Sequence, residues 1–251
     1  MDRRELGGHQ RRSAVAPAES RVIDTLAQRM GELARQLQEQ HGVDDTLRSI
    51  VHAAVDTIPG AQYAGISVIE RRATVRTPVF SDDIVAKVDQ AQIELAEGPC
   101  VDVLYQRQTV RSSNLATEPR WPRFAARAVE LGVHSMLSFQ LFVTGDDLGA
   151  LNLYSERSGA FSDDDAEEIG LLFAAHAAVA MADAQNIANL TIAVASRDLI
   201  GQAKGILMER YQLTSDQAFD LLVRTSQTTN TKLHQIADYL VRSRQLPGGT
   251  V

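Results

Sequence analysis

The chain has 251 residues, a net charge of −7 and a hydrophobic content of 44%, enough for one large domain or two smaller ones. The acidic balance argues against non-specific nucleic-acid binding by the whole surface, and a single cysteine excludes an intrachain disulfide. No apolar run of signal length follows the N-terminal arginines, and no stretch of about 18 apolar residues is present. We therefore expect a cytoplasmic protein without a membrane span.

Charge is distributed unevenly along the chain. Residues 40–185 contain eleven Lys/Arg against twenty-one Asp/Glu, a net charge of −10, whereas residues 191–251 contain seven against five, a net charge of +2. The middle of the chain is thus an acidic body, and the C-terminal piece is mildly basic. A basic patch on this last piece is compatible with the acidic whole.

The N-terminal region divides into two segments. Residues 1–20 show no hydrophobic periodicity and are predicted to be a mobile leader. Residues 21–40 are predicted to be helical, because apolar residues repeat at heptad spacing over less than three heptads. This seam consists of Ile23, Leu26, Met30, Leu33 and Leu37. Its short length favours pairing with another helix over an independent coiled coil.

The acidic body is predicted to mix helices and strands. Hydrophobic periodicity and Pro or Gly breaks define the elements. Helices are expected at 44–58, 83–96, 99–106 and 122–131, and strands at 63–70, 73–80, 109–114, 135–143 and 148–155. The strand at 109–114 has the character of an edge strand, and "TGDD" between the last two strands has hairpin chemistry.

The C-terminal piece is predicted to contain three helices. No proline or other stop signal occurs from about residue 163 to 210, which indicates one long helix, or two with a slight break near 186–189. Thr214 and Gln217 then have the spacing of a capping box. The next helix has an apolar face of Ala218, Phe219, Leu222 and Val223, a polar loop is expected at 226–230, and an amphipathic helix starts at Leu233.

A family resemblance lies in the segment "LSFQLFVTGDDLGALNLYSERSGAFSDDDAEEIGLLFAAHAAVA". It joins two strands by a tight turn to a helix start made of Phe and acidic residues. This order resembles the second half of a GAF domain, and the resemblance covers roughly residues 44–182. It implies a GAF-like domain at 41–185, with an antiparallel sheet flanked by helices, that senses a small ligand or mediates dimerisation.

Catalysis finds little support in this body. The sequence has no Cys/His pair at short spacing, no second cysteine and no metal-ligand cluster, so we predict no enzyme activity and no metal site, and no cofactor is identified. Cys100 follows Pro99 near a helix start, which would lower the pKa of the thiol. Because some GAF domains bind bilins through a cysteine, a redox or covalent role stands beside the alternative of a small buried side chain.

A second resemblance covers residues 196–242, "SRDLIGQAKGILMERYQLTSDQAFDLLVRTSQTTNTKLHQIADYLV". The stretches "AKGILM", "AFDLL", "SQ" and "KLHQIA" resemble the ANTAR domain in order and spacing. ANTAR is a three-helix RNA-binding module of bacterial antiterminators, and it binds paired hairpins in nascent transcripts. The resemblance implies an α+β protein in which a long helix joins the GAF-like sheet to an all-α ANTAR domain at 186–251. This arrangement is common in actinobacteria.

The residues of this helix support a contact surface without the family. With about 100° per residue, the core face holds Leu199, Ile200, Ala203, Ile206 and Leu207. A separate stripe consists of Arg197, Gly201, Lys204 and Met208, with Gly205 at its border. Two cations without bulk between them suit RNA phosphates, and the glycines equally suit close approach of a second helix. Further candidate RNA-binding residues are Ser226, Gln227, Thr228, Asn230 and Lys232, although capping and turn formation explain this cluster as well.

We therefore expect an RNA-binding antitermination regulator whose partner is hairpin RNA. The low charge of the C-terminal piece indicates that tight binding needs two copies, as in a homodimer. The alternatives are a one-component DNA-binding regulator, a GAF-fold redox or ligand sensor that acts through protein partners, and a scaffold whose last helices bind protein.

Overall fold

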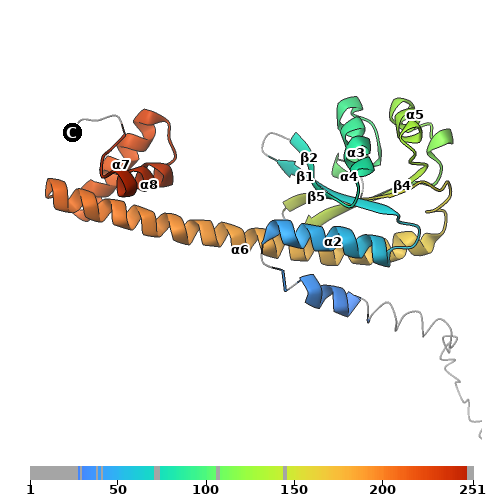
Figure 1. Ribbon diagram of the computed structural model, residues 1–251, viewed down its shortest axis with the longest axis horizontal. Helices are drawn as coiled ribbons and strands as arrows, with labels where there is room; N and C mark the ends of the chain where they lie inside the picture. Colours follow the sequence, from blue (N-terminus) through green and yellow to red (C-terminus); the bar gives the residue numbers. More distant parts are fainter. Residues whose placement is uncertain are drawn as a thin grey trace, which may run out of the picture. The chain divides into compact units, whose positions relative to one another are not determined.

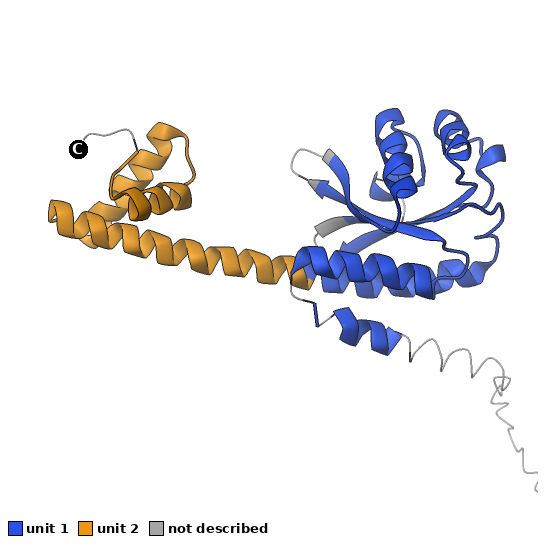
Figure 2. Ribbon diagram, in the orientation of Figure 1, with its two compact units in different colours: residues 1–182 blue, residues 183–251 orange. Residues whose placement is uncertain are grey.

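The computed structural model describes residues 28, 30–37, 39–40, 42–70, 74–105, 108–143 and 146–247. The chain divides into two compact units, residues 1–182 and 183–251 (Figure 2). The predicted leader at 1–20 lies outside the described residues. The predicted boundary between residues 185 and 186 lies three residues from this division.

The first unit is built on a five-stranded antiparallel sheet with the order β2-β1-β5-β4-β3. The strands are β1 (Tyr63–Glu70), β2 (Thr74–Phe80), β3 (Thr109–Ser112), β4 (Ser135–Val143) and β5 (Asp146–Ser155). The predicted strands, the edge position of β3 and the β1–β2 pairing are confirmed. β5 begins two residues earlier than predicted, within the "TGDD" turn.

The two faces of the sheet carry different residues because side chains alternate along a strand. Figure 1 shows α2 (Val43–Thr57) and α6 (Asp164–Tyr211) along one face and α3 (Asp83–Leu95), α4 (Pro99–Tyr105) and α5 (Pro122–Glu130) over the other. The core on the α2 and α6 side includes Ile66, Leu137, Phe139, Leu151 and Leu153. The opposite core includes Val110, Phe124, Met136, Ala150 and Tyr154.

The described part of the N-terminal region is helical at residues 28 and 30–37. Met30, Leu33 and Leu37 are buried in the core that α2 also contributes to. These three are members of the predicted heptad seam, whose other two residues, Ile23 and Leu26, lie outside the described residues. The segment thus pairs with other helices of the first unit, as its short length predicts.

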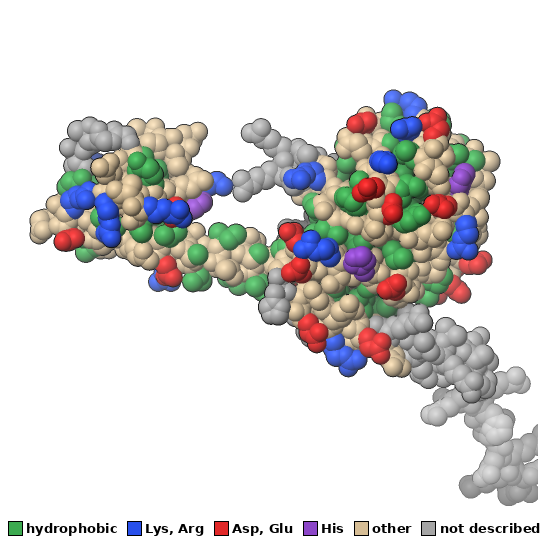
Figure 3. Space-filling view, viewed as in Figure 1, with side chains coloured by type: hydrophobic (Ala, Val, Ile, Leu, Met, Phe, Trp, Pro, Cys, Tyr) green, Lys and Arg blue, Asp and Glu red, His purple; other side chains and the backbone are tan. Residues whose placement is uncertain are grey.

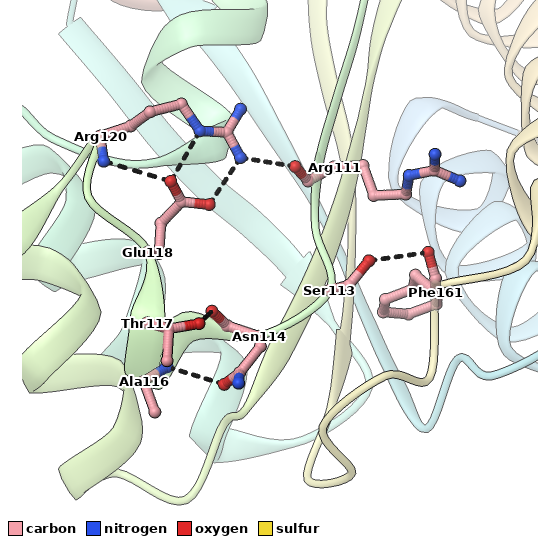
Figure 4. A network of polar contacts seen from close by, with 8 residues as sticks. All are labelled: Arg111, Ser113, Asn114, Ala116, Thr117, Glu118, Arg120 and Phe161. Carbon is pink, nitrogen blue, oxygen red and sulfur yellow. Dashed lines mark hydrogen bonds and ion pairs between the residues drawn. The ribbon is translucent and has the colours of Figure 1, made fainter.

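The connection between β3 and α5 is held by a polar network (Figure 4). The Glu118 carboxylate accepts hydrogen bonds from the Arg120 guanidinium, from Nε at 2.8 Å and from Nη2 at 2.6 Å, and Arg120 Nη2 also donates to the Arg111 carbonyl. The pKa of Glu118 is lowered, chiefly by the hydrogen bond from Arg120. Arg120 lies over the Trp121 ring, 4.2 Å from its centre. These contacts explain the ordered course of an irregular segment.

Helix α6 runs for 48 residues without a break, so the single long helix is the correct alternative. By length and composition alone it could cross a membrane, although it contains no uninterrupted run of about 18 apolar residues. Yet its residues from Ala166 to Met181 enter the core of the first unit, and Ala203 and Leu207 enter the core of the second. The helix is therefore a core helix of both units.

The second unit adds α7 (Ser215–Thr229) and α8 (Leu233–Ser243) to the end of α6. The predicted capping box is present, since Thr214 accepts from the Gln217 amide and the Gln217 side chain accepts from Thr214. The core consists of Ala203, Leu207, Ala218, Leu222, Ile236, Ala237 and Leu240. The predicted polar loop at 226–230 is wrong: α7 continues through Thr229, and Asn230 ends it in a left-handed conformation at φ 50°.

Candidate functional site

The predicted stripe of α6 lies on an open surface of the second unit. Ala203 and Leu207 are buried, whereas Arg197, Gly201, Gly205 and Met208 are exposed. A Cβ atom built on either glycine would meet nothing within 4 Å. The core face predicted from helical spacing is thus confirmed, and both glycines leave backbone open to a partner.

The structure adds Phe219 to this surface. The sequence predicted Phe219 for the core of α7, but its side chain is 39% exposed while Ala218 and Leu222 are fully buried. The ammonium nitrogen of Lys204 lies over the Phe219 ring, 5.8 Å from its centre. The prediction was wrong because the helical spacing that defines the apolar face of α7 also places Phe219 at its border, about 60° from Leu222.

The second predicted cluster lies at the end of α7 and the start of α8. The hydroxyl of Ser226 donates to the Thr231 carbonyl at 2.6 Å, so it closes the turn between the helices. Gln227, Thr228, Asn230 and Lys232 are exposed, and Lys232 is the N-cap residue of α8. Four of the five predicted residues therefore stay accessible, and Ser226 has a structural partner.

Positive charge on the second unit is largely unpaired. Arg242 forms an ion pair with Asp238 at 2.9 Å, and Arg210 donates to the Arg244 carbonyl. Among the described residues of this unit, five further cations have no ion-pair partner: Arg197, Lys204, Arg224, Lys232 and Arg244. Figure 3 shows Lys and Arg side chains gathered on one face of this unit. Unpaired cations on an open surface suit a polyanion.

The first unit contains a buried polar cluster that the sequence did not predict. The carboxylate of Asp89, on α3, accepts hydrogen bonds from the Tyr154 hydroxyl, from Thr77 Oγ1 at 2.7 Å, from Gln92 Nε2 at 2.9 Å and from Ser67 Oγ at 3.3 Å. Burial raises the pKa of Asp89, although these hydrogen bonds oppose the change. The cluster joins α3 to β1, β2 and β5.

Cys100 belongs to the same cluster. Its side chain is buried, its amide donates to Gln92 Oε1 at 2.9 Å, and its thiol donates to Ser67 Oγ at 3.4 Å. Burial, with the nearby Asp89 carboxylate, raises the pKa of the thiol to about 12. The expected lowering of this pKa at a helix start is therefore wrong, since burial outweighs it. In this geometry the small buried side chain is the better supported alternative.

No group of three or more His, Cys, Asp or Glu residues that could hold a metal ion occurs in the described part of the chain.

The cluster around Asp89 is built from hydroxyl, amide and thiol groups that form hydrogen bonds with the carboxylate and with one another. Sequence reasoning missed it because Asp89 and Gln92 stand among polar residues of α3. Their shared face with Val85 and Val88 was the available signal.

Two family models match the chain. The model described as "GAF domain" matches residues 40–182, and that described as "ANTAR domain" matches residues 188–241. No curated protein sequence matches significantly. The two domain types are sensory and regulatory and are generally not enzymatic, and together they support a regulator with a sensory GAF domain and an RNA-binding ANTAR output.

Solved structures share the fold of the first unit. The GAF domain of a phosphoenolpyruvate-protein phosphotransferase from Coxiella burnetii is 15% identical, with a TM-score of 0.51, and the match covers 65% of this chain and 96% of that one. The Stigmatella aurantiaca phytochrome photosensory core module is 9% identical, with a TM-score of 0.56, and the match covers 87% of this chain and 46% of that one.

An enzyme is also among the similar structures. The type II free methionine-R-sulfoxide reductase from Thermoplasma acidophilum is 16% identical, with a TM-score of 0.44, and the match covers 60% of this chain and 96% of that one. Identities this low show the fold alone.

The GAF model covers more than half of the length of this chain, and the ANTAR model covers most of the remaining C-terminal residues. The chain therefore belongs to the GAF domain family and carries a C-terminal ANTAR domain.

Proposed function

We propose that this protein is a cytoplasmic transcription antitermination regulator that binds hairpins in nascent RNA. The ANTAR match over residues 188–241 is the observation that carries the proposal. The unpaired cations Arg197, Lys204 and Lys232 and the open backbone at Gly201 and Gly205 support it, because a phosphate backbone needs both charge and close approach. Protein bound to a hairpin would prevent the terminator from forming.

The test compares RNA with DNA and then measures termination. The full chain is used to select hairpins from cellular RNA, and the selected hairpin is compared with duplex DNA of the same sequence in gel-shift titrations. We expect preferential RNA binding and increased readthrough of the downstream terminator during transcription in vitro. Tighter binding to the DNA duplex would favour the DNA-binding alternative, and binding to neither would favour a scaffold that binds protein.

Removing two cations of the stripe is expected to weaken RNA binding without unfolding. In the variant with both Arg197→Ala and Lys204→Ala, affinity for RNA should fall roughly 10- to 30-fold at about 0.15 M salt. The plot of log K against log salt should become less steep, its negative slope shrinking in magnitude by about 1.5, because two phosphate contacts are lost. Fluorescence anisotropy over a salt series measures both. Arg242→Ala is the matched control, because its charge is already paired with Asp238; equal losses in the two proteins would contradict the site.

We further propose that the protein acts as a homodimer. Ile187, Leu190 and Val194 are 65%, 66% and 61% exposed on α6. They are spaced by three and four residues, as in the seam of a coiled coil. In a monomer this apolar stripe would stay in contact with water, whereas pairing with the α6 helix of a second copy would bury it. Two copies would also provide two RNA-binding modules, which offsets the low charge of each.

Signal transfer through α6 is the proposed role of the GAF domain, beside dimerisation. The support is the unbroken helix, whose two ends belong to the cores of the two units. A ligand bound in the GAF domain would change the register or crossing of paired α6 helices, and so the spacing of the RNA-binding modules. We expect deletion of residues 1–163 to change RNA affinity, measured by gel shift. An unchanged affinity in a truncated chain that is still dimeric would remove the support for coupling.

A further inference from the structure

The exposed Phe219 ring and the Lys204 ammonium together form a surface with unusual chemistry. The Phe219 side chain is 39% exposed. Of its neighbours in the chain, Ala218 is fully buried and Asp220 is exposed, so Phe219 lies at the edge of the buried face of α7. An isolated exposed apolar residue needs no explanation. Here the ring is paired with a cation from another helix, and over the described residues the structure records only one other such pair, Arg120 with Trp121.

The surroundings of this pair leave room for a flat ligand. Gly201 lies one turn before Lys204, and Gly205 follows it directly. Apart from their chain neighbours and the backbone of their own helix, no atom lies within 4 Å of the position that a Cβ would take on either glycine. Lys204 has no ion-pair partner, so its charge is available. Asp216 and Asp220 lie about 60° and 100° around α7 from Phe219. A negatively charged group is therefore favoured on the Lys204 side of the ring and disfavoured on the other.

We propose that Phe219 stacks on one unpaired base of an RNA loop while Lys204 contacts the phosphate of the same nucleotide. A nucleotide joins a flat aromatic base to an anionic phosphate, and the Phe219 and Lys204 pair offers a complementary ring and cation. Unpaired RNA bases stack on aromatic side chains in this manner. The inference rests on the proposed RNA-binding function and adds to it a contact with a base, beyond the phosphate contacts of the stripe.

A second helix is the competing occupant of the same surface. The spacing of Gly201 and Gly205 would admit one, but a two-fold contact would bring Lys204 and Arg197 of both copies together along the stripe. Like charges at such a contact oppose association. Charge on this surface thus favours RNA over a second copy of the chain.

The experiment uses the full chain and two matched RNA probes. The first probe is the hairpin that the wild-type protein selects from a pool with a randomised loop, and the second has the same stem and an abasic loop, which keeps the phosphates and removes the bases. We expect the wild type to prefer the first probe by roughly 5- to 150-fold, the contribution of one stacked base. Phe219→Leu should lose this preference, whereas Phe219→Trp should keep it. Tyr239→Leu, which removes an exposed aromatic residue of α8 without a cation over its ring, should also keep it.

The outcomes separate this inference from the proposed function. Failure to select any hairpin would overturn RNA binding itself. A selected hairpin with an unchanged preference in Phe219→Leu would overturn only the stacking contact. A Phe219→Leu protein that melts like the wild type, keeps its preference for bases and shifts to monomer in sedimentation would assign the surface to a second copy of the chain.

Discussion

Replacing Asp89 by alanine is expected to lower the free energy of unfolding of the first unit by about 2–6 kcal/mol. Asp89 accepts from four side chains inside the protein and is 2% exposed. The hydroxyls of Ser67 and Thr77 can rotate toward each other, since their oxygens are 3.1 Å apart. Tyr154 and Gln92 would keep a buried donor without an acceptor, at about 1–3 kcal/mol each. Urea denaturation followed by circular dichroism measures the loss.

Two further substitutions make this expectation specific. Asp83→Ala, in the exposed first turn of the same helix, should cost no more than about 1 kcal/mol from the helix dipole. Asp89→Asn should keep all four contacts, because its amide can donate to the Ser67 and Thr77 hydroxyls while its oxygen accepts from Tyr154 and Gln92. A similar loss in Asp89→Asn and Asp89→Ala would show that the negative charge itself is needed, contrary to this account.

The raised pKa of Asp89 also gives a pH dependence. The folded state holds the proton at pH values where the unfolded state has lost it, so the contribution to stability is full below the ordinary carboxyl pKa near 4. It falls as pH rises from there toward the raised value. The stability of the wild type relative to Asp89→Asn should therefore decrease over this window. An increase would mean that the hydrogen bonds outweigh burial.

The sequence predicted the regular elements because their patterns are local. The alternation of strands and the heptad and helical spacings depend on neighbouring residues, and the long α6 was indicated by the lack of a stop signal between residues 163 and 210. The end of α7 was missed for a related reason. Ser226 to Thr229 have loop-like composition, but they remain helical because Asn230 ends the helix and Ser226 closes the turn to Thr231.

The sites were less predictable because they join distant parts of the chain. Asp89 meets Tyr154 across 65 residues and Ser67 across 22, and no local pattern reveals such a pairing. The stripe from Arg197 to Met208 was predictable, since one helix supplies it. Its extension by Phe219 needed the packing of α7 on α6, which places the ring beneath Lys204.

Charges placed in the exposed stripe of α6 are expected to convert the proposed dimer to a monomer. In the variant with both Leu190→Glu and Val194→Glu, two side chains that are 66% and 61% exposed become acidic. The fold of each chain should be unaffected, because neither residue belongs to a core. In a paired helix, however, like charges would face each other across the seam. Analytical ultracentrifugation measures the change in mass.

Loss of the dimer should also separate binding to one hairpin from binding to two. Affinity for an RNA with two hairpins should fall by roughly 10²- to 10⁴-fold, while affinity for one isolated hairpin should remain, because avidity is lost and the individual contacts are kept. Ile192→Glu is the matched control: Ile192 is 61% exposed but lies about 200° around the helix from Leu190, so this variant should stay dimeric. If the double variant also stays dimeric, the seam is not on this face of α6. If it becomes monomeric and still binds both hairpins with wild-type affinity, two linked modules are not what provides tight binding.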